Sequence, residues 1–194
     1  MSTPSPHAPG SGSFFTAAAD LYLRCYPDPV LGVRCHPLGL PDDAARACIR
    51  RMFDLMYEHQ GIGLAAPQVG WNARVFVVNI DIEDHDPELE RVFIDPQLSH
   101  PSQPPEEGEE GCLSLPGLRL EVDRTPQVNV KATGLDGEQF ELETDGILAR
   151  CIQHENDHLD GILITARIST LQRIAVDGAL REMRDDWQQR EEES

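Results

Sequence analysis

The sequence is poor in basic residues. It contains 16 lysines and arginines against 34 aspartates and glutamates in 194 residues, so its formal net charge is −18. Proteins contact nucleic-acid phosphates mainly through Lys and Arg. This charge therefore excludes a large sequence-independent nucleic-acid interface and leaves room only for a small basic patch. No stretch approaches the roughly 18 apolar residues of a membrane-spanning helix, so we expect no membrane partner either.

The sequence also lacks paired cysteines and a targeting signal. There are five cysteines, an odd number, and no two of them form a C-x-x-C motif. The sequence therefore predicts neither a disulfide scaffold nor a zinc ribbon. The N-terminal residues have neither the basic and apolar regions of a secretory signal nor the arginines of a transit peptide. We therefore expect a cytoplasmic protein in a reducing compartment.

Hydrophobic residues make up 40% of the chain. A chain of this length and composition can bury the core of one domain. Residues 1–20 begin with a stretch rich in Ser, Pro and Gly, which predicts a disordered or weakly ordered lead-in. Residues 21–194 are expected to form a single domain.

Three helices are predicted from apolar spacing and from signals at their ends. The first spans 42–59, behind a good N-cap at Asp42. The second spans about 146–160, and the third spans about 170–189. In the third helix we expect four apolar side chains to contact the rest of the protein: Leu171, Ile174, Met183 and Trp187.

Strands are predicted between these helices. The β-branched run 74–82 predicts a buried strand, with 91–94 as its partner. Residues 127–133 and 139–144 alternate with period two around a turn, which predicts a hairpin. The Pro- and Glu-rich segment 96–116 is predicted to be a long loop. Together these elements indicate an α+β fold, with antiparallel sheets packed around a central helix and with N-terminal and C-terminal helices.

The second helix carries an H-E-x-x-H motif. His154 and His158 are four residues apart, with a helical rise of about 6 Å between them, so both imidazoles can reach one metal ion. Glu155 lies beside them as a candidate general base. The two histidines extend a helical stripe that contains Ile147 and Cys151, so we expect the ligands to face the interior.

A catalytic metal site of this kind needs a third protein ligand. The metzincin pattern fails, because Ile164 stands where its third histidine should be. A thermolysin-like site would take a glutamate from a later helix, and the spacing leaves Glu182 open for that role. The other candidate is Cys112, in the predicted loop.

Three segments together resemble the motifs of bacterial peptide deformylases. They are GIGLAAPQVG (61–70), EGCLS (110–114) and QHENDHL (153–159), in that order and spacing. The resemblance begins with the DPVL segment (28–31) and covers about residues 27–170. It implies that the predicted domain is a deformylase-like catalytic domain.

The resemblance also implies a metal site. Its ligands map to Cys112, His154 and His158, with water in the fourth position. The implied metal is Fe(II), which nickel or cobalt can replace, while zinc gives a poorer enzyme. Thiolate and imidazole ligands are compatible with both iron and zinc, so the spacing by itself does not choose between them.

The implied reaction is hydrolysis of the N-formyl group from the initiator methionine of a new polypeptide. In this scheme Glu155 takes a proton from the attacking water and passes it to the leaving amine. The oxyanion that forms needs donors placed in advance. By the family pattern these are the side-chain amide of Gln68 and the backbone N–H of Leu113.

Five further positions are implied to bind the substrate: Gly61, Ile62, Gly63, Gly111 and Arg119. Glycines suit a site where the protein backbone must lie against an extended peptide. Near them, Arg124 is predicted to be structural, and Glu110 is predicted to hold the neighbouring loop in place.

The implied partners are N-formylmethionyl nascent peptides, with a transient ribosome contact and no specific nucleic acid. Residues 181–194 contain three arginines and six acids, so docking at the ribosome through a basic C-terminal helix is not expected. Three alternatives stay open. One is a metallopeptidase, which would not need Cys112; another is a non-catalytic relative; the third is a deformylase of a different N-formyl compound.

Overall fold

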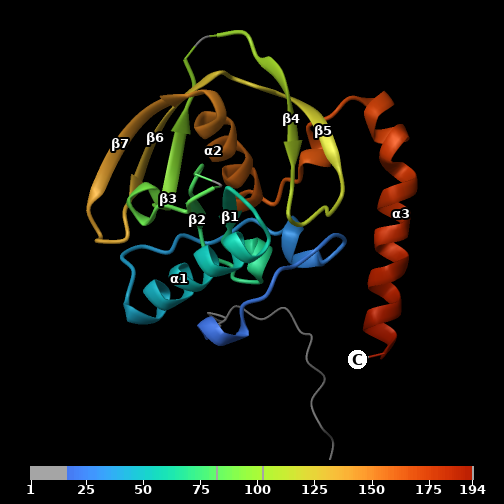
Figure 1. Ribbon diagram of the computed structural model, residues 1–194, viewed down its shortest axis with the longest axis horizontal. Coiled ribbons are helices and arrows are strands. Elements are labelled where there is room, and N and C mark those ends of the chain that lie inside the picture. The colour runs from blue at the N-terminus through green and yellow to red at the C-terminus, as the bar shows by residue number, and fades with distance from the viewer. Residues whose placement is uncertain (1–16, 82, 102, 194) are drawn as a thin grey trace, which may run out of the picture.

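A five-stranded antiparallel sheet and a separate two-stranded ribbon form the β-structure of this computed structural model (Figure 1), which describes residues 17–81, 83–101 and 103–193. The five-stranded sheet has the order β1-β2-β3-β6-β7, with all neighbours antiparallel. Its strands are β1 (Gly63–Ala65), β2 (Val75–Val78), β3 (Arg91–Ser99), β6 (Gln127–Thr133) and β7 (Gln139–Asp145). The predicted hairpin is confirmed as β6 and β7.

The ribbon consists of β4 (Glu106–Gly111) and β5 (Arg119–Arg124). It lies within the segment 96–116 and just beyond it, so the prediction of a long loop there was wrong. Glu and Gly are poor strand formers, but β4 pairs with β5 along its whole length, from Glu106 opposite Arg124 to Gly111 opposite Arg119. Seven residues, 112–118, join the two strands. Strand β5 alternates buried and exposed residues, but the acidic sequence of β4 has no such pattern that would predict a strand.

Helix α2 (Gly146–Leu159) lies between the sheet and the ribbon, as predicted for the central helix (Figure 1). Helix α1 (Asp43–Glu58) begins at Asp42, whose side chain accepts a hydrogen bond from the backbone N–H of Ala45 (2.8 Å). Helix α3 (Thr170–Glu193) runs along one side of the molecule, next to the ribbon. The predicted α+β architecture is therefore confirmed.

The sheet separates two apolar clusters, and strand β2 contributes to both. Val75 and Val77 pack in the cluster that contains α1, whereas Phe76 and Val78 pack in the cluster that contains α2. Because both faces of this strand are covered, all four of its residues are apolar and buried. The sheet thereby holds α2 firmly from one side.

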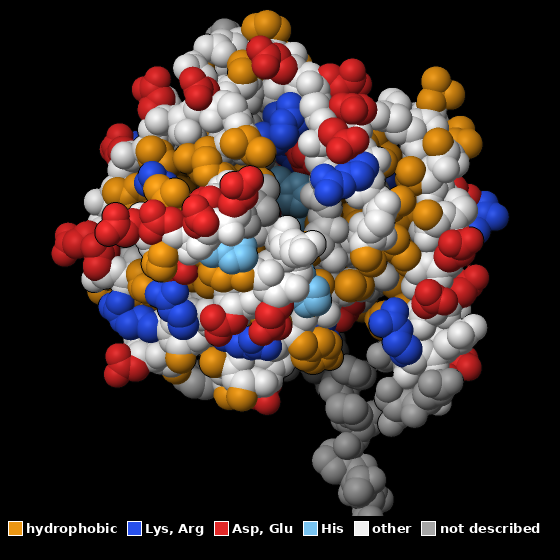
Figure 2. All heavy atoms as spheres, in the orientation of Figure 1, with side chains coloured by type: hydrophobic (Ala, Val, Ile, Leu, Met, Phe, Trp, Pro, Cys, Tyr) orange, Lys and Arg blue, Asp and Glu red, His pale blue; other side chains and the backbone are white. Residues whose placement is uncertain are grey.

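Helix α3 contacts the body through one narrow face. Val176, Leu180 and Met183 pack against the third apolar cluster, which includes β5. Leu171 and Ile174 are instead 80% and 67% exposed, so the expectation that they contact the body was wrong. A helix presents one stripe to a neighbour, and these two residues lie off that stripe. In the space-filling view, hydrophobic side chains follow the junction between α3 and the body (Figure 2).

Several boundaries differ from the predictions. Strand β2 ends at Val78, well before residue 82, which lies outside the described residues. Ile147 is 57% exposed, so the buried stripe of α2 begins later than expected. Of the predicted lead-in 1–20, residues 1–16 lie outside the described residues, and Ala18–Asp20 form a short 3-10 helix. Among the described helices, none combines the length and the apolar character needed to cross a bilayer.

Candidate metal centre and active site

Cys112, His154 and His158 converge on one point. Cys112 Sγ lies 3.3 Å from His158 Nε2, and that nitrogen lies 3.2 Å from His154 Nε2. The candidate ligand atoms all lie within 4.8 Å of one another, and all three residues are buried. Helix α2 supplies both histidines, and the residue directly after β4 supplies the cysteine. Two elements far apart in the sequence therefore build one site.

The chemistry of these three residues fits a divalent transition metal. His154 Nδ1 lies 2.9 Å from Glu110 Oε2, and this contact leaves Nε2 of the same ring as the candidate ligand atom on the side of Cys112. A thiolate and two imidazoles are ligands that both iron and zinc accept. Glu182, the alternative third ligand, is exposed on α3 and does not belong to this group.

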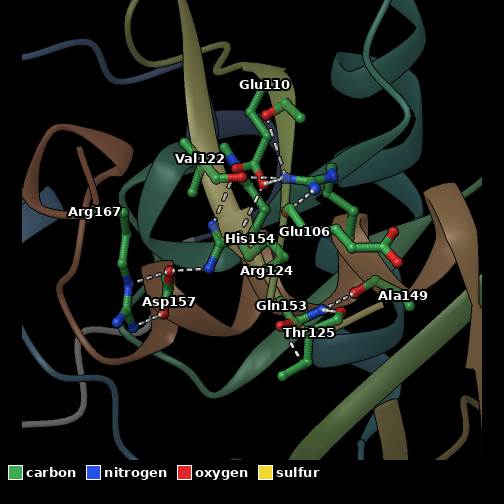
Figure 3. A network of polar contacts seen from close by, with 12 residues as sticks. Glu106, Glu110, Val122, Arg124, Thr125, Ala149, Gln153, His154, Asp157 and Arg167 are labelled. Carbon is green, nitrogen blue, oxygen red and sulfur yellow. Dashed lines mark hydrogen bonds and ion pairs between the residues drawn. The ribbon is translucent and has the colours of Figure 1, made fainter. Parts of the chain in front are cut away.

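A buried network of charged side chains supports the candidate ligand His154 (Figure 3). Arg124 donates to both oxygens of Glu110 (2.9 and 3.0 Å) and to Asp157 Oδ2 (2.6 Å). Arg167 pairs with the same aspartate. Burial by itself would raise the pKa of Glu110, but the hydrogen bonds from His154 and Arg124 lower that pKa to about 2. Glu110 is therefore a fixed negative charge behind the ligand.

Glu155 lies in the same helix with a different environment. It is buried, and its Oε2 has no hydrogen-bond partner among the described residues. Burial raises the pKa of Glu155 to about 7. A Cβ on Gly63 would lie 2.5 Å from Glu155 Oε1 and 2.7 Å from Cys151 Sγ. The glycine at this position therefore lets strand β1 lie directly against the carboxylate.

Gln68 lies on the other side of the cysteine. Its Oε1 accepts a hydrogen bond from the backbone N–H of Ala65 (2.8 Å), which fixes the orientation of the amide. Its Nε2 then points to Ser114 Oγ (3.2 Å) and to Cys112 Sγ (3.6 Å). Leu113 follows the cysteine directly. The structure thus brings both predicted oxyanion donors to the position beside the ligand group.

The predicted substrate-binding residues lie on β1, in the two residues before it, and on the ribbon. A Cβ on Gly61 would lie 2.8 Å from Leu113 Cδ1, and the carbonyl of Ile62 accepts from the thiol of Cys151 (3.7 Å). Gly111 is paired with Arg119 in the ribbon. The side chain of Arg119 is 70% exposed and lies 3.9 Å from Glu109.

Sequence reasoning missed two contributors to the site. Ser114, fully buried, accepts from the Gln68 amide, and Asp157 anchors Arg124. The expectation that Glu110 holds its neighbourhood in place agrees with its contacts, and so does the structural role expected for Arg124. The position of Asp157 one helical turn after His154 was the available signal, since residues three apart share a helix face.

The fold and the site together define a metal-dependent hydrolase, because a buried Cys/His/His group lies next to a carboxylate of raised pKa. The family model for polypeptide deformylase matches residues 21–174. The peptide deformylase of Acidobacterium capsulatum is 44% identical over 158 residues, covering 81% of this chain and 92% of its own. That of Pseudomonas aeruginosa is 44% identical over 155 residues, covering 80% and 90%.

Solved structures agree with this assignment. A Plasmodium falciparum peptide deformylase has a TM-score of 0.83 at 36% identity and covers 86% of this chain and 97% of its own. One from Synechococcus elongatus in complex with actinonin has a TM-score of 0.78 at 39% identity, covering 84% and 87%. The chain belongs to the polypeptide deformylase family. It is a metal-dependent enzyme that removes the N-formyl group from the formylmethionine of newly synthesised polypeptides and releases formate.

Proposed function

We propose that Cys112, His154 and His158 are the ligands of the metal and that Glu155 moves the proton in the hydrolysis. The observation that carries this proposal is the convergence of three buried ligand atoms within 4.8 Å beside a carboxylate with an unpartnered oxygen. When bound, the metal supplies Lewis acidity, which lowers the pKa of a water molecule and polarises the formyl oxygen. All other steps belong to side chains of the protein.

Glu155 accepts the proton of the attacking water and then donates it to the amine of the departing methionine. A pKa of about 7 suits a group that must accept a proton in one step and release it in the next. Its free Oε2 supports the same role, because no described neighbour competes for the proton.

Gln68 and Leu113 stabilise the oxyanion that forms on the formyl carbon. The support is the orientation of the Gln68 amide, whose Nε2 donors face the cysteine side of the site while Ala65 holds its oxygen. A donor fixed in advance costs no reorganisation during the reaction. The backbone N–H of Leu113 is the second donor.

The formylated peptide lies along β1 and the end of the ribbon, where Gly61, Ile62, Gly63 and Gly111 present backbone to it. The small residues there permit the close approach that an added peptide strand requires. Arg119 is exposed at this edge and contacts the downstream part of the peptide.

The resident metal is Fe(II), with nickel, cobalt or zinc able to replace it in purified protein. The residues 21–194 form one catalytic domain that acts in the cytoplasm on nascent peptides, in transient contact with the ribosome. The support for the single domain is the extent of the family match, which starts at residue 21. The thiolate and imidazole ligand set accepts iron as well as zinc, and the choice of iron rests on the family resemblance.

The test compares two buried cysteines. Protein purified without oxygen and loaded with Fe(II) or Ni(II) is assayed for formate release from formyl-Met-Ala-Ser and for bound metal. Cys112→Ser should lose both, whereas Cys35→Ser, in the core cluster under α2, should keep both. Full metal content and formate release in Cys112→Ser would overturn the ligand assignment. Cleavage of internal peptide bonds without formate release would favour the metallopeptidase alternative.

A further inference from the structure

Arg150 joins the helix that carries the histidines to the ribbon that carries the cysteine. We propose that Arg150 is a positioning residue: its guanidinium clamps the β4–β5 ribbon onto α2 and so holds Cys112 at ligand distance from His154 and His158. This proposal rests on the ligand assignment above. It concerns the placement of a ligand, and Arg150 itself touches neither metal nor substrate.

The guanidinium of Arg150 bonds to the backbone of both strands of the ribbon. Its Nη1 donates to the carbonyl of Val122 in β5 (2.7 Å), and its Nη2 donates to the carbonyl of Glu106 in β4 (2.8 Å). Nη1 also donates to Glu110 Oε1 (3.0 Å) and makes a longer contact with the carbonyl of Gly108 (3.3 Å). The side chain is only 20% exposed. Figure 3 labels the three residues that receive these hydrogen bonds, Glu106, Glu110 and Val122.

Strand β4 has little else to attach it to the helix. Its sequence is EEGEEG, and Glu110 is its only buried residue. The apolar side chains of the ribbon, Leu120 and Val122, belong to β5 and pack in the cluster that includes Leu180 of α3. Hydrophobic packing therefore fixes the ribbon towards α3, while polar contacts from Arg150 and around Glu110 fix β4 towards α2.

Gly108 is matched to this arginine. A Cβ at this position would lie 2.7 Å from Arg150 Nη2 and 2.8 Å from its Cζ, so the guanidinium occupies the space of the missing side chain. Gly108 does not have a positive φ, so alanine could adopt its backbone conformation. The close approach of the arginine is what requires glycine here.

The clamp and the ligands share one helix face. Arg150 lies one turn before His154, and residues four apart in a helix project from the same side. The ribbon continues from Glu110 through Gly111 to Cys112. Fixing β4 on this face thus fixes the direction from which the thiolate approaches the imidazoles.

The effect of removing Arg150 should be mechanical rather than electrostatic. Arg124 still neutralises Glu110 through two hydrogen bonds when Arg150 is gone. A lysine at 150 would keep the charge but lose the fork, since an ammonium group cannot span carbonyls of two strands as a planar guanidinium does. The lysine variant therefore separates the geometry of the clamp from its charge.

The test uses Arg150→Met, Arg150→Lys, Gly108→Ala and the double variant Gly108→Ala with Arg150→Met. Each protein is loaded with Co(II), and the intensity of the thiolate-to-cobalt charge-transfer band and the rate of metal release to a chelator are measured. Supporting residues of metal ligands typically change affinity by about 10- to 100-fold. We expect metal release to be accelerated by about this factor in Arg150→Met and in Gly108→Ala, with a weakened band.

Arg150→Lys should release metal as fast as Arg150→Met. The double variant should release metal no faster than either single variant, because both changes remove the same clamp. Two variants serve as controls: Arg51→Met, which loses a surface ion pair with Glu58, and Gly178→Ala on the exposed side of α3, where an added Cβ meets nothing within 4 Å. Both controls should release metal at the parental rate.

The outcomes separate this proposal from the ligand assignment. A parental protein that shows no thiolate band overturns the assignment of Cys112 and the clamp with it. If the parental protein shows the thiolate band and both Arg150→Met and Gly108→Ala keep its intensity, the ligand assignment stands and the clamp proposal is overturned. If Arg150→Met does not fold, Gly108→Ala decides, because it leaves every native side chain in place; a parental release rate in that variant overturns the clamp.

Discussion

Two buried glutamates lie beside the proposed metal ligands, and their pKa values are shifted in opposite directions. Glu110, at the end of β4, receives hydrogen bonds from Arg124, Arg150 and His154, and its pKa is lowered to about 2. Glu155, on α2, has an oxygen without a partner, and its pKa is raised to about 7 by burial. The residue type and the burial are the same, so the neighbours decide the difference.

The difference in pKa suits the two glutamates to two separate tasks in a hydrolytic site. A carboxylate that never takes a proton can orient a ligand and balance its charge, whereas one that titrates near neutral pH can carry a proton through the reaction. If the comparison is correct, changing each glutamate should affect a different property. The following predictions test that separation, beginning with the largest effect.

Glu155→Gln should lower kcat for formate release by about 10³-fold, because general acid–base groups typically contribute 10²- to 10⁴-fold. Metal content should stay at the parental level, since the ligands are intact. Formate release and bound metal are measured together, with Glu121→Gln in the exposed part of β5 as the control. If kcat of the metal-loaded variant falls by less than tenfold, Glu155 does not carry the proton.

Glu110→Gln should mainly affect stability. It leaves Arg124 buried beside Asp157 with half of its negative partners gone, and breaking a buried ion pair costs about 3 kcal/mol or more. Urea unfolding of the metal-free protein measures this loss in the free energy of unfolding. Glu109→Gln, at the neighbouring exposed position, should change it by less than about 0.5 kcal/mol. Equal stability of the two variants would contradict the role of Glu110 as a fixed charge.

The pH dependence of stability should differ in sign between the two glutamates. The folded-state pKa of Glu155, about 7, lies above the ordinary value of 4.5, so its contribution to stability is present below pH 4.5 and is lost as the pH rises through 7. The free energy of unfolding of Glu155→Gln should therefore rise by roughly 3 kcal/mol relative to that of the metal-free parent between pH 4.5 and 8. Glu110, with its pKa near 2, contributes stability above pH 4.5 that is lost as the pH falls towards 2.

Urea unfolding across this pH range checks both statements. The difference in unfolding free energy between Glu155→Gln and the parent should increase as the pH rises. The difference between Glu110→Gln and the parent should become smaller as the pH falls. If the unfolding free energies of the parent and both variants change with pH in parallel, the two glutamates do not differ in pKa as described.

Arg119→Ala should have the smallest effect. The side chain is 70% exposed and its contact with Glu109 is long, so it contributes no more than about 1 kcal/mol. We expect KM for a formylated tripeptide to rise less than about fivefold and kcat to stay constant, because the interaction is equal in the ground and transition states. Arg34→Ala, at another exposed arginine, is the control. A change in kcat would place Arg119 closer to the reaction than we propose.

The sequence predicted the parts of this molecule that follow a local rule. Helices α1 and α2 have end signals and apolar periodicity, and the β6–β7 hairpin alternates around a turn. The pair His154 and His158 follows from helical spacing, whereas the residues alone left Cys112 and Glu182 open as third ligand and the family resemblance selected Cys112. The β4–β5 ribbon was missed because the acidic sequence of β4 has no strand pattern of its own and forms a strand by pairing with β5. The exposure of Leu171 and Ile174 was missed because the spacing does not say which face of α3 meets the body.

The attachment of α3 decides where substitutions reach the active site. This helix packs on the body through Val176, Leu180 and Met183. Gln172, Arg173 and Arg184 add hydrogen bonds to the body. All proposed reaction groups lie earlier in the chain. Substitutions on the side of α3 that faces away from the body therefore leave every proposed reaction group in its place.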